Sequence, residues 1–137
     1  MPKKSGYSQL HEPLNEQPLE VLTHGGKPYK TPRGMPSKVK VHGQHFQVFY
    51  HSNIYTMNFQ RLRGIVMYAQ RLIIIDPKQT LHMMRETLYH EMAHVYLHTW
   101  QMKSKSLRKL TGPQVEDLCD LFAEAHYDAR LNNRGPA

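Results

Sequence analysis

The feature that most constrains the fold is a stretch from Thr80 to Gln101 that contains neither proline nor glycine. Its apolar residues recur at helical spacing, which predicts an amphipathic helix: Leu81, Met84, Leu88 and Val95. Inside this helix lies the motif H-E-x-x-H, from His90 to His94. Residues four apart share one face of a helix, so the spacing lets both imidazoles reach one metal ion.

A second pattern, E-x-x-x-D, follows at Glu116 and Asp120, in a helix that we expect to open at Thr111-Gly112-Pro113. A hydrolytic zinc site takes three protein ligands and leaves one position open for water. Glu116 would complete a His-His-Glu ligand set, and Glu91 would take a proton from the metal-bound water. Asp120 would accept the second ring N–H of a zinc-binding histidine and so fix its tautomer.

Alternating apolar and polar residues before the first helix predict strands. The residues from Val39 to Tyr50 are typical of a hairpin around Gly43. Residues 65–68 and 71–75 indicate a second antiparallel pair, which Asp76-Pro77 ends because proline cannot donate to a strand ladder. Strands followed by two helices predict the α+β class.

The domain organisation follows from length and composition. A chain of 137 residues fits one domain. Residues 1–37 are rich in proline and glycine, and their apolar residues follow no period. We therefore expect a largely disordered or extended arm over residues 1–37 and one folded domain over residues 38–133.

The net charge of +7 is concentrated in residues 1–40 and 101–110. A basic balance of this size permits weak nucleic-acid contact through the loop 103–109 and the N-terminal arm, and plain solvation of both segments is the alternative. The longest apolar run, residues 72–75, is far shorter than the ~20 residues of a membrane span. With Cys119 alone, an intramolecular disulfide is impossible. We expect a cytoplasmic protein without membrane contact.

Residues 85–98 resemble the active-site helix of the ImmA/IrrE-like metallopeptidases, and residues 114–118 resemble the helix that supplies their acidic ligand. Residues 39–48 and 64–76 are similar to strands of the short phage-type members. The resemblance implies a minimal zincin-like fold, in which a small antiparallel or mixed sheet packs on the H-E-x-x-H helix and a ligand helix follows. It also implies a zinc endopeptidase that cleaves a regulatory protein, such as a repressor, in a phage or mobile element, in the host cytoplasm if phage-encoded.

Two other interpretations stay open. The segment from Leu88 to His94 also resembles the SprT-like proteases, which act on DNA-bound proteins. Those proteases take a third histidine from a Gly-His-Gly segment, whereas after His98 this chain has only His126, without flanking glycines. The second alternative is a regulatory module that keeps a zincin fold but does not cleave.

Three further side chains are candidates for contact with a substrate or an oxyanion. His98 continues the four-residue spacing, but three successive turns of one helix cannot all reach one ion. We therefore expect it at the rim of the pocket or in contact with a ligand, with a plain surface position as the alternative. His126 and Tyr127 could donate to a substrate carbonyl or a tetrahedral oxyanion, with packing between the helices as the alternative. Cys119 lies on the apolar stripe of the second helix, where we expect a buried and inert thiol.

Overall fold

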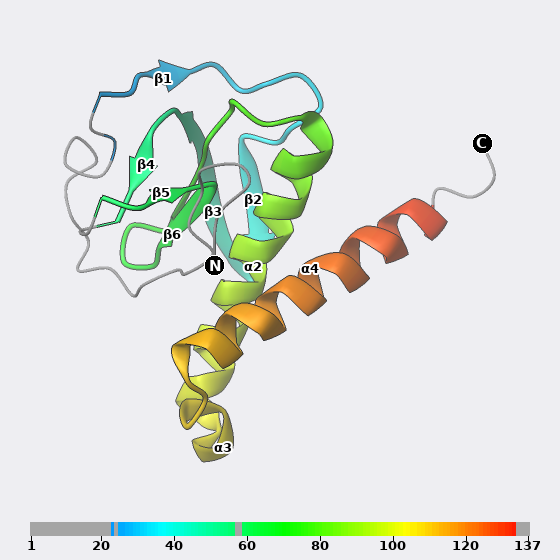
Figure 1. Cartoon of the computed structure of the whole chain (residues 1–137). Coiled ribbons are helices and arrows are strands. Elements are labelled where there is room, and N and C mark those ends of the chain that lie inside the picture. Colours follow the sequence, from blue (N-terminus) through cyan, green and yellow to red (C-terminus); the bar gives the residue numbers. More distant parts are fainter. Residues whose placement is uncertain (1–22, 24, 57–58, 134–137) are drawn as a thin grey trace.

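The computed structural model describes residues 23, 25–56 and 59–133, with side chains as far as Tyr127. Over these residues the chain forms a mixed five-stranded sheet, a separate two-stranded sheet and three helices (Figure 1). The strands precede the helices in the sequence, so the predicted α+β class with a small mixed sheet is confirmed.

The five-stranded sheet has the order β1-β3-β7-β6, and β2 also pairs with β3. Its strands are β1 (Pro28–Tyr29), β2 (Lys38–Val41), β3 (Gln44–His51), β6 (Gly64–Met67) and β7 (Leu72–Ile75). Antiparallel pairing joins β3 to β1 and β2, and joins β6 to β7, while β3 and β7 are parallel. The second sheet joins β4 (Ile54–Tyr55) to β5 (Arg61–Leu62).

Both predicted antiparallel pairs are present. His42 and Gly43 turn β2 into β3 with φ values of 51° and 79°, the left-handed conformation that a type I′ hairpin turn requires at both central positions. The pair β6–β7 forms with Ile65 opposite Ile74, and β7 ends at Ile75, just before Asp76-Pro77. The parallel β3–β7 pairing was not predicted, because periodicity within a strand does not specify its partner.

The folded part of the chain begins before the predicted boundary at Lys38. β1 pairs with β3, and Met35 is buried in the core cluster beneath the sheet. A two-residue strand and a single buried methionine leave no period in the sequence, so periodicity does not distinguish this segment from the arm. Residues 1–22 and 24 of the predicted arm lie outside the described residues.

Helix α2 (Leu81–Lys103) matches the predicted helix closely. It begins after Thr80, whose side chain accepts a hydrogen bond from the Met83 N–H, as an N-cap should. The predicted basic connection contains one further helical turn, α3 (Lys105–Arg108), before α4 (Gly112–Asn133). In the part of the chain that the structure describes, no helix is long and apolar enough to cross a membrane.

Helix α2 packs against both the five-stranded sheet and α4. One of its faces packs on the sheet in a large cluster, which includes Met84 and Leu88 from the helix and Val48 and Ile73 from the strands. Another face packs on α4, which crosses α2 (Figure 1). The two-stranded sheet covers part of the opposite face of the large sheet, where Ile54 and other residues pack in a separate cluster. Residues of α2 between the sheet and α4 are therefore enclosed.

Candidate metal centre

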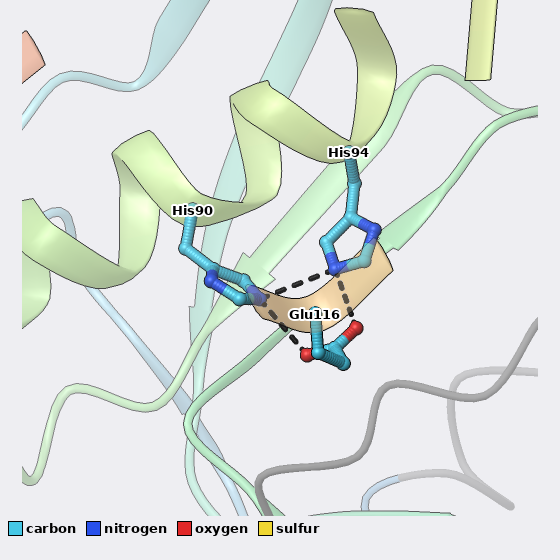
Figure 2. A group of neighbouring side chains, drawn as sticks. All are labelled: His90, His94 and Glu116. Carbon is cyan, nitrogen blue, oxygen red and sulfur yellow. Dashed lines mark hydrogen bonds and ion pairs between the residues drawn. The ribbon is translucent and has the colours of Figure 1, made fainter. Parts of the chain in front are cut away.

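His90, His94 and Glu116 come together between α2 and α4 (Figure 2). His90 and His94 lie one turn apart on α2, so both rings point to the same side, and Glu116 reaches them from the first turns of α4. His94 and Glu116 are buried, and the side chain of His90 is 16% exposed. The structure thus brings together the three residues that the sequence predicted as ligands.

The ligand atoms lie within hydrogen-bond distance of one another. The Nε2 atom of His90 is 3.2 Å from Oε1 of Glu116, and that of His94 is 2.9 Å from Oε2 of the same carboxylate. The two Nε2 atoms are 3.2 Å apart. Taking one ligand atom from each residue, all of them lie within 4.8 Å of one another.

This donor set fits a divalent cation. Two imidazole nitrogens and a buried carboxylate converge on one point, where a bound cation would balance the buried charge of Glu116. Nitrogen and oxygen ligands of this kind suit zinc, and three protein ligands leave a fourth position open. The same set also suits other first-row divalent ions.

Asp120 contacts the His90 ring at Nδ1, the nitrogen that faces away from the other two candidate ligands. Its Oδ1 is 2.8 Å from Nδ1 of His90, one turn of α4 beyond Glu116. A carboxylate on Nδ1 keeps the proton on that nitrogen and leaves Nε2 to face the ligand cluster. The side chain of Asp120 is 71% exposed, so it contacts the site from the solvent side.

When no metal is bound, the neighbouring charged groups determine the protonation of His90 and Glu116. Burial disfavours the charged imidazole of His90 and by itself would lower its pKa. Hydrogen bonds with Asp120 and Glu116, together with the negative charges of Glu91 and Glu116, outweigh the effect of burial. They raise the pKa of His90 to about 10. Burial likewise disfavours the charged carboxylate of Glu116, but hydrogen bonds and charges from His90 and His94 lower its pKa to about 2. A cation that binds here would therefore displace a proton from His90.

Glu91 is on the same turn of α2 as the ligands and is 3% exposed. It faces β6, where Gly64 allows a close approach of strand and helix. A Cβ atom on Gly64 would lie 2.6 Å from Cγ2 of Thr87 and 3.4 Å from Cγ of Glu91. Sequence reasoning did not identify Gly64 as part of the site, although a glycine at the start of an apolar strand is a signal of close backbone approach.

His98, on α2, lies beside the turn between β6 and β7. Its exposed ring stacks on Tyr68 with 4.2 Å between ring centroids and 20° between planes. The Tyr68 hydroxyl donates to the backbone carbonyl of His94 over 3.4 Å. Tyr68, which was not predicted as a site residue, thus connects His98 to the ligand turn.

His126 and Tyr127 lie on another side of the α2–α4 contact. The ring of His126 is 4.5 Å from that of Tyr89 and lines an apolar groove of about 370 Å³, and the Tyr127 hydroxyl is 3.0 Å from Nδ1 of His82. Among the described residues, neither forms a hydrogen bond or ion pair with the three ligands. Their predicted role as substrate contacts stays a prediction.

Cys119 is fully buried between α2 and α4, as expected from its place on the apolar stripe. Burial, followed by the charges of Glu116 and Glu91, raises the pKa of its thiol. A thiol that resists ionisation is a poor nucleophile, in agreement with the prediction that Cys119 is inert.

Comparison with protein-family models found no match to this chain. Searches of curated proteins and of solved structures found none either. The interpretation of the site therefore depends on its own geometry and on the sequence motifs.

Proposed function

We propose that this protein is a zinc-dependent endopeptidase on a zincin-like fold. The observation that supports it is the convergence of His90, His94 and Glu116 ligand atoms within 4.8 Å, next to the buried carboxylate of Glu91. Glu91 follows His90 directly in α2, so its side chain lies near the ion without being needed as a ligand. A two-histidine, one-carboxylate set beside a carboxylate that is not a ligand is the chemistry of metal-assisted peptide hydrolysis.

His90, His94 and Glu116 would hold the ion, and Asp120 would orient the His90 ring. When bound, zinc supplies the Lewis acidity that polarises a peptide carbonyl and acidifies water. Glu91 would accept a proton from the attacking water and deliver it to the leaving amine. Its burial between α2 and Gly64 keeps the carboxylate close to the cluster and shielded from bulk water.

The sheet offers a way to bind an extended substrate. β6 is the last strand in the sheet order and contacts α2, so its outer edge runs beside the helix that carries the ligands. A peptide that adds to this edge would be aligned by main-chain hydrogen bonds. Such recognition tolerates many sequences. From the resemblance to ImmA/IrrE-like enzymes we propose a regulatory protein, such as a repressor, as the physiological substrate.

The test uses zinc content and cleavage together. Glu91→Gln should keep about one equivalent of zinc, because Glu91 is not a ligand, and should lose ~10²–10⁴-fold in cleavage rate. Cleavage would be followed by mass spectrometry on a library of peptides from a digested proteome. His90→Ala should lose both zinc and cleavage.

Glu86→Gln is the matched control, since it removes one negative charge from an outward-facing position of α2. It should change neither readout. Equal cleavage by the wild-type protein and Glu91→Gln would refute the role of Glu91. Stoichiometric zinc in a wild-type protein that cleaves no peptide would favour the non-cleaving regulatory module.

A further inference from the structure

All strands in the described part of the chain come from a segment without acidic residues. Between Glu20 and Asp76 the sequence contains no Asp or Glu. The same segment contains eight basic residues: Lys27, Lys30, Arg33, Lys38, Lys40, Arg61, Arg63 and Arg71. Asp76, the first acid after the strands, is fully buried and pairs with Arg61 over 3.1 Å. The segment that carries the strands is therefore cationic, whereas most acidic residues lie on the helices.

One face of β3 projects ring-bearing side chains to solvent. Phe46, Val48 and Tyr50 are buried under α2, and the alternate residues His45, Gln47 and Phe49 are exposed on the opposite face. Phe49 has 48% of its surface exposed. The two-stranded sheet covers the neighbouring part of this face, where Ile65 and Ile74 are buried, but it leaves the β3 row open.

Two lysines flank this row. Lys38 is opposite Gln47 and Lys40 is opposite His45 in the antiparallel β2–β3 pair, and directly opposed residues share one face of a sheet. Both lysines are exposed, and within the described part of the chain neither forms an ion pair. We call the surface of Lys38, Lys40, His45, Gln47 and Phe49 the β3 strip.

We propose that the β3 strip binds single-stranded nucleic acid. Its exposed lysines attract phosphates and release their counterions. The exposed Phe49 ring offers a face on which a base can stack, and imidazole rings such as that of His45 can do the same. Alternate residues of a strand lie ~6.6 Å apart, so the row presents successive groups along an extended chain. This surface lies on the face of the sheet opposite α2, and the inference does not rest on the proposed peptidase activity.

The strip suits a single strand better than a duplex. In a duplex the bases are stacked inside, and their edges are read by a helix or a two-stranded ribbon that enters a groove. The β3 strip is the open face of a sheet, with its ring on β3 and its cations on the adjacent β2. An exposed ring contributes binding energy only when a base is free to lie on it.

A second cationic region provides a matched control. Lys103, Lys105, Arg108 and Lys109 are all exposed around α3, at the end of α2 far from the sheet (Figure 1). If charge alone governed binding, neutralising two lysines there would have the same effect as neutralising two in the strip. The proposal requires a difference between the two regions.

The test measures fluorescence anisotropy of labelled oligothymidylate with the full-length protein between ~50 and ~200 mM salt. Lys38→Gln/Lys40→Gln should reduce the magnitude of the log–log salt slope by ~0.7 for each phosphate that the protein no longer neutralises. Phe49→Leu should weaken binding about fivefold or more with the slope unchanged, because stacking carries no charge. Phe49→Tyr, which keeps the ring, should bind as the wild type does.

Lys103→Gln/Lys105→Gln should leave both affinity and slope unchanged. Melting temperatures would establish that each variant is folded, and all substituted side chains are exposed in the structure. Four results would overturn the proposal: no binding at ~50 mM salt, equal weakening by the two lysine pairs, wild-type affinity for Phe49→Leu, or equal affinity for a duplex of the same length. The combination of a slope change specific to Lys38 and Lys40 and a weakening specific to the Phe49 ring would support it.

Discussion

Helix α2 is held differently on its two sides. On the sheet side it packs against a broad aliphatic layer in which Ile73 and Ile75 are fully buried. On the α4 side the apolar cluster is smaller and centres on Ala93, Leu97 and Cys119. The three candidate metal ligands lie on this second side, where their polar contacts add to a small hydrophobic contact.

The two sides of α2 position different parts of the site. Glu91 lies against Gly64 of the sheet, so the proposed base is positioned by the large core. Glu116 comes from α4, which packs on α2 and leaves Leu121 61% and Phe122 41% exposed. A bound ion would then be a second attachment between α4 and the rest of the molecule.

The largest expected effect is that of metal removal on α4. A ligand present at ~1,000 times its Kd stabilises the state that binds it by about 4 kcal/mol. Since α4 supplies Glu116 while α2 supplies both histidines, we expect chelation to lower hydrogen-exchange protection in α4 by up to that amount and to leave β3 and β7 less affected. Exchange measured by mass spectrometry, with and without a chelator, checks this.

Glu116→Ala in the presence of zinc should reproduce the effect of the chelator, because it removes the ligand that α4 supplies. Glu124→Ala, an exposed acid further along α4, is the control and should keep wild-type protection. An equal fall of protection in α4 and in the strands would mean that the two sides of α2 unfold as one unit.

A smaller effect is expected from Gly64→Ala, which tests the sheet side. The new Cβ would lie 2.6 Å from Cγ2 of Thr87, whose hydroxyl donates to Gln79. Overpacking of this kind costs ~1–3 kcal/mol and would displace α2 at Glu91. We expect a fall in cleavage rate of up to ~10²-fold with zinc content unchanged.

Thr87→Ser removes the methyl group that the new Cβ would strike but keeps the hydroxyl. The new Cβ would still lie 3.2 Å from the carbonyl oxygen of Ile74, so the double variant Gly64→Ala/Thr87→Ser should recover part of the cleavage rate. If zinc is lost with Gly64→Ala, the sheet positions the ligands as well as Glu91. Cleavage kinetics and zinc content, measured on the same samples, distinguish these outcomes.

Local patterns in the sequence predicted the elements that carry the ligands. The spacing of His90 and His94, the E-x-x-x-D pattern and the absence of proline from the first helix are all properties of one helix at a time. The structure places Glu116 beside both histidines and Asp120 beside His90, as expected. The hairpin around Gly43 was predicted for the same reason.

Contacts between elements distant in the sequence could not be predicted in this way. The parallel β3–β7 pairing and the pairing of β1 with β3 depend on how the chain folds back, which periodicity does not record. Gly64 and Tyr68 were missed as site residues because their importance arises from α2 lying against β6 and the turn after it. The partners of His126 and Tyr127 could not be predicted either, because a position on one helix does not fix the side from which α2 approaches.

The smallest expected effect separates the outer contact of His90 from its ligand contact. Asp120→Asn keeps a group that can accept the Nδ1 proton but removes the charge. Removal of such an outer partner typically costs 10–100-fold in metal affinity, and the 71% exposure of Asp120 places the expected decrease near tenfold. Competition with a chromophoric chelator measures the affinity. Asp117→Asn, whose exposed side chain lies ~100° around α4 from Glu116, should bind zinc as the wild type does. A decrease for Asp120→Asn as large as that for Glu116→Ala would make Asp120 a ligand and move the metal site toward the surface of α4.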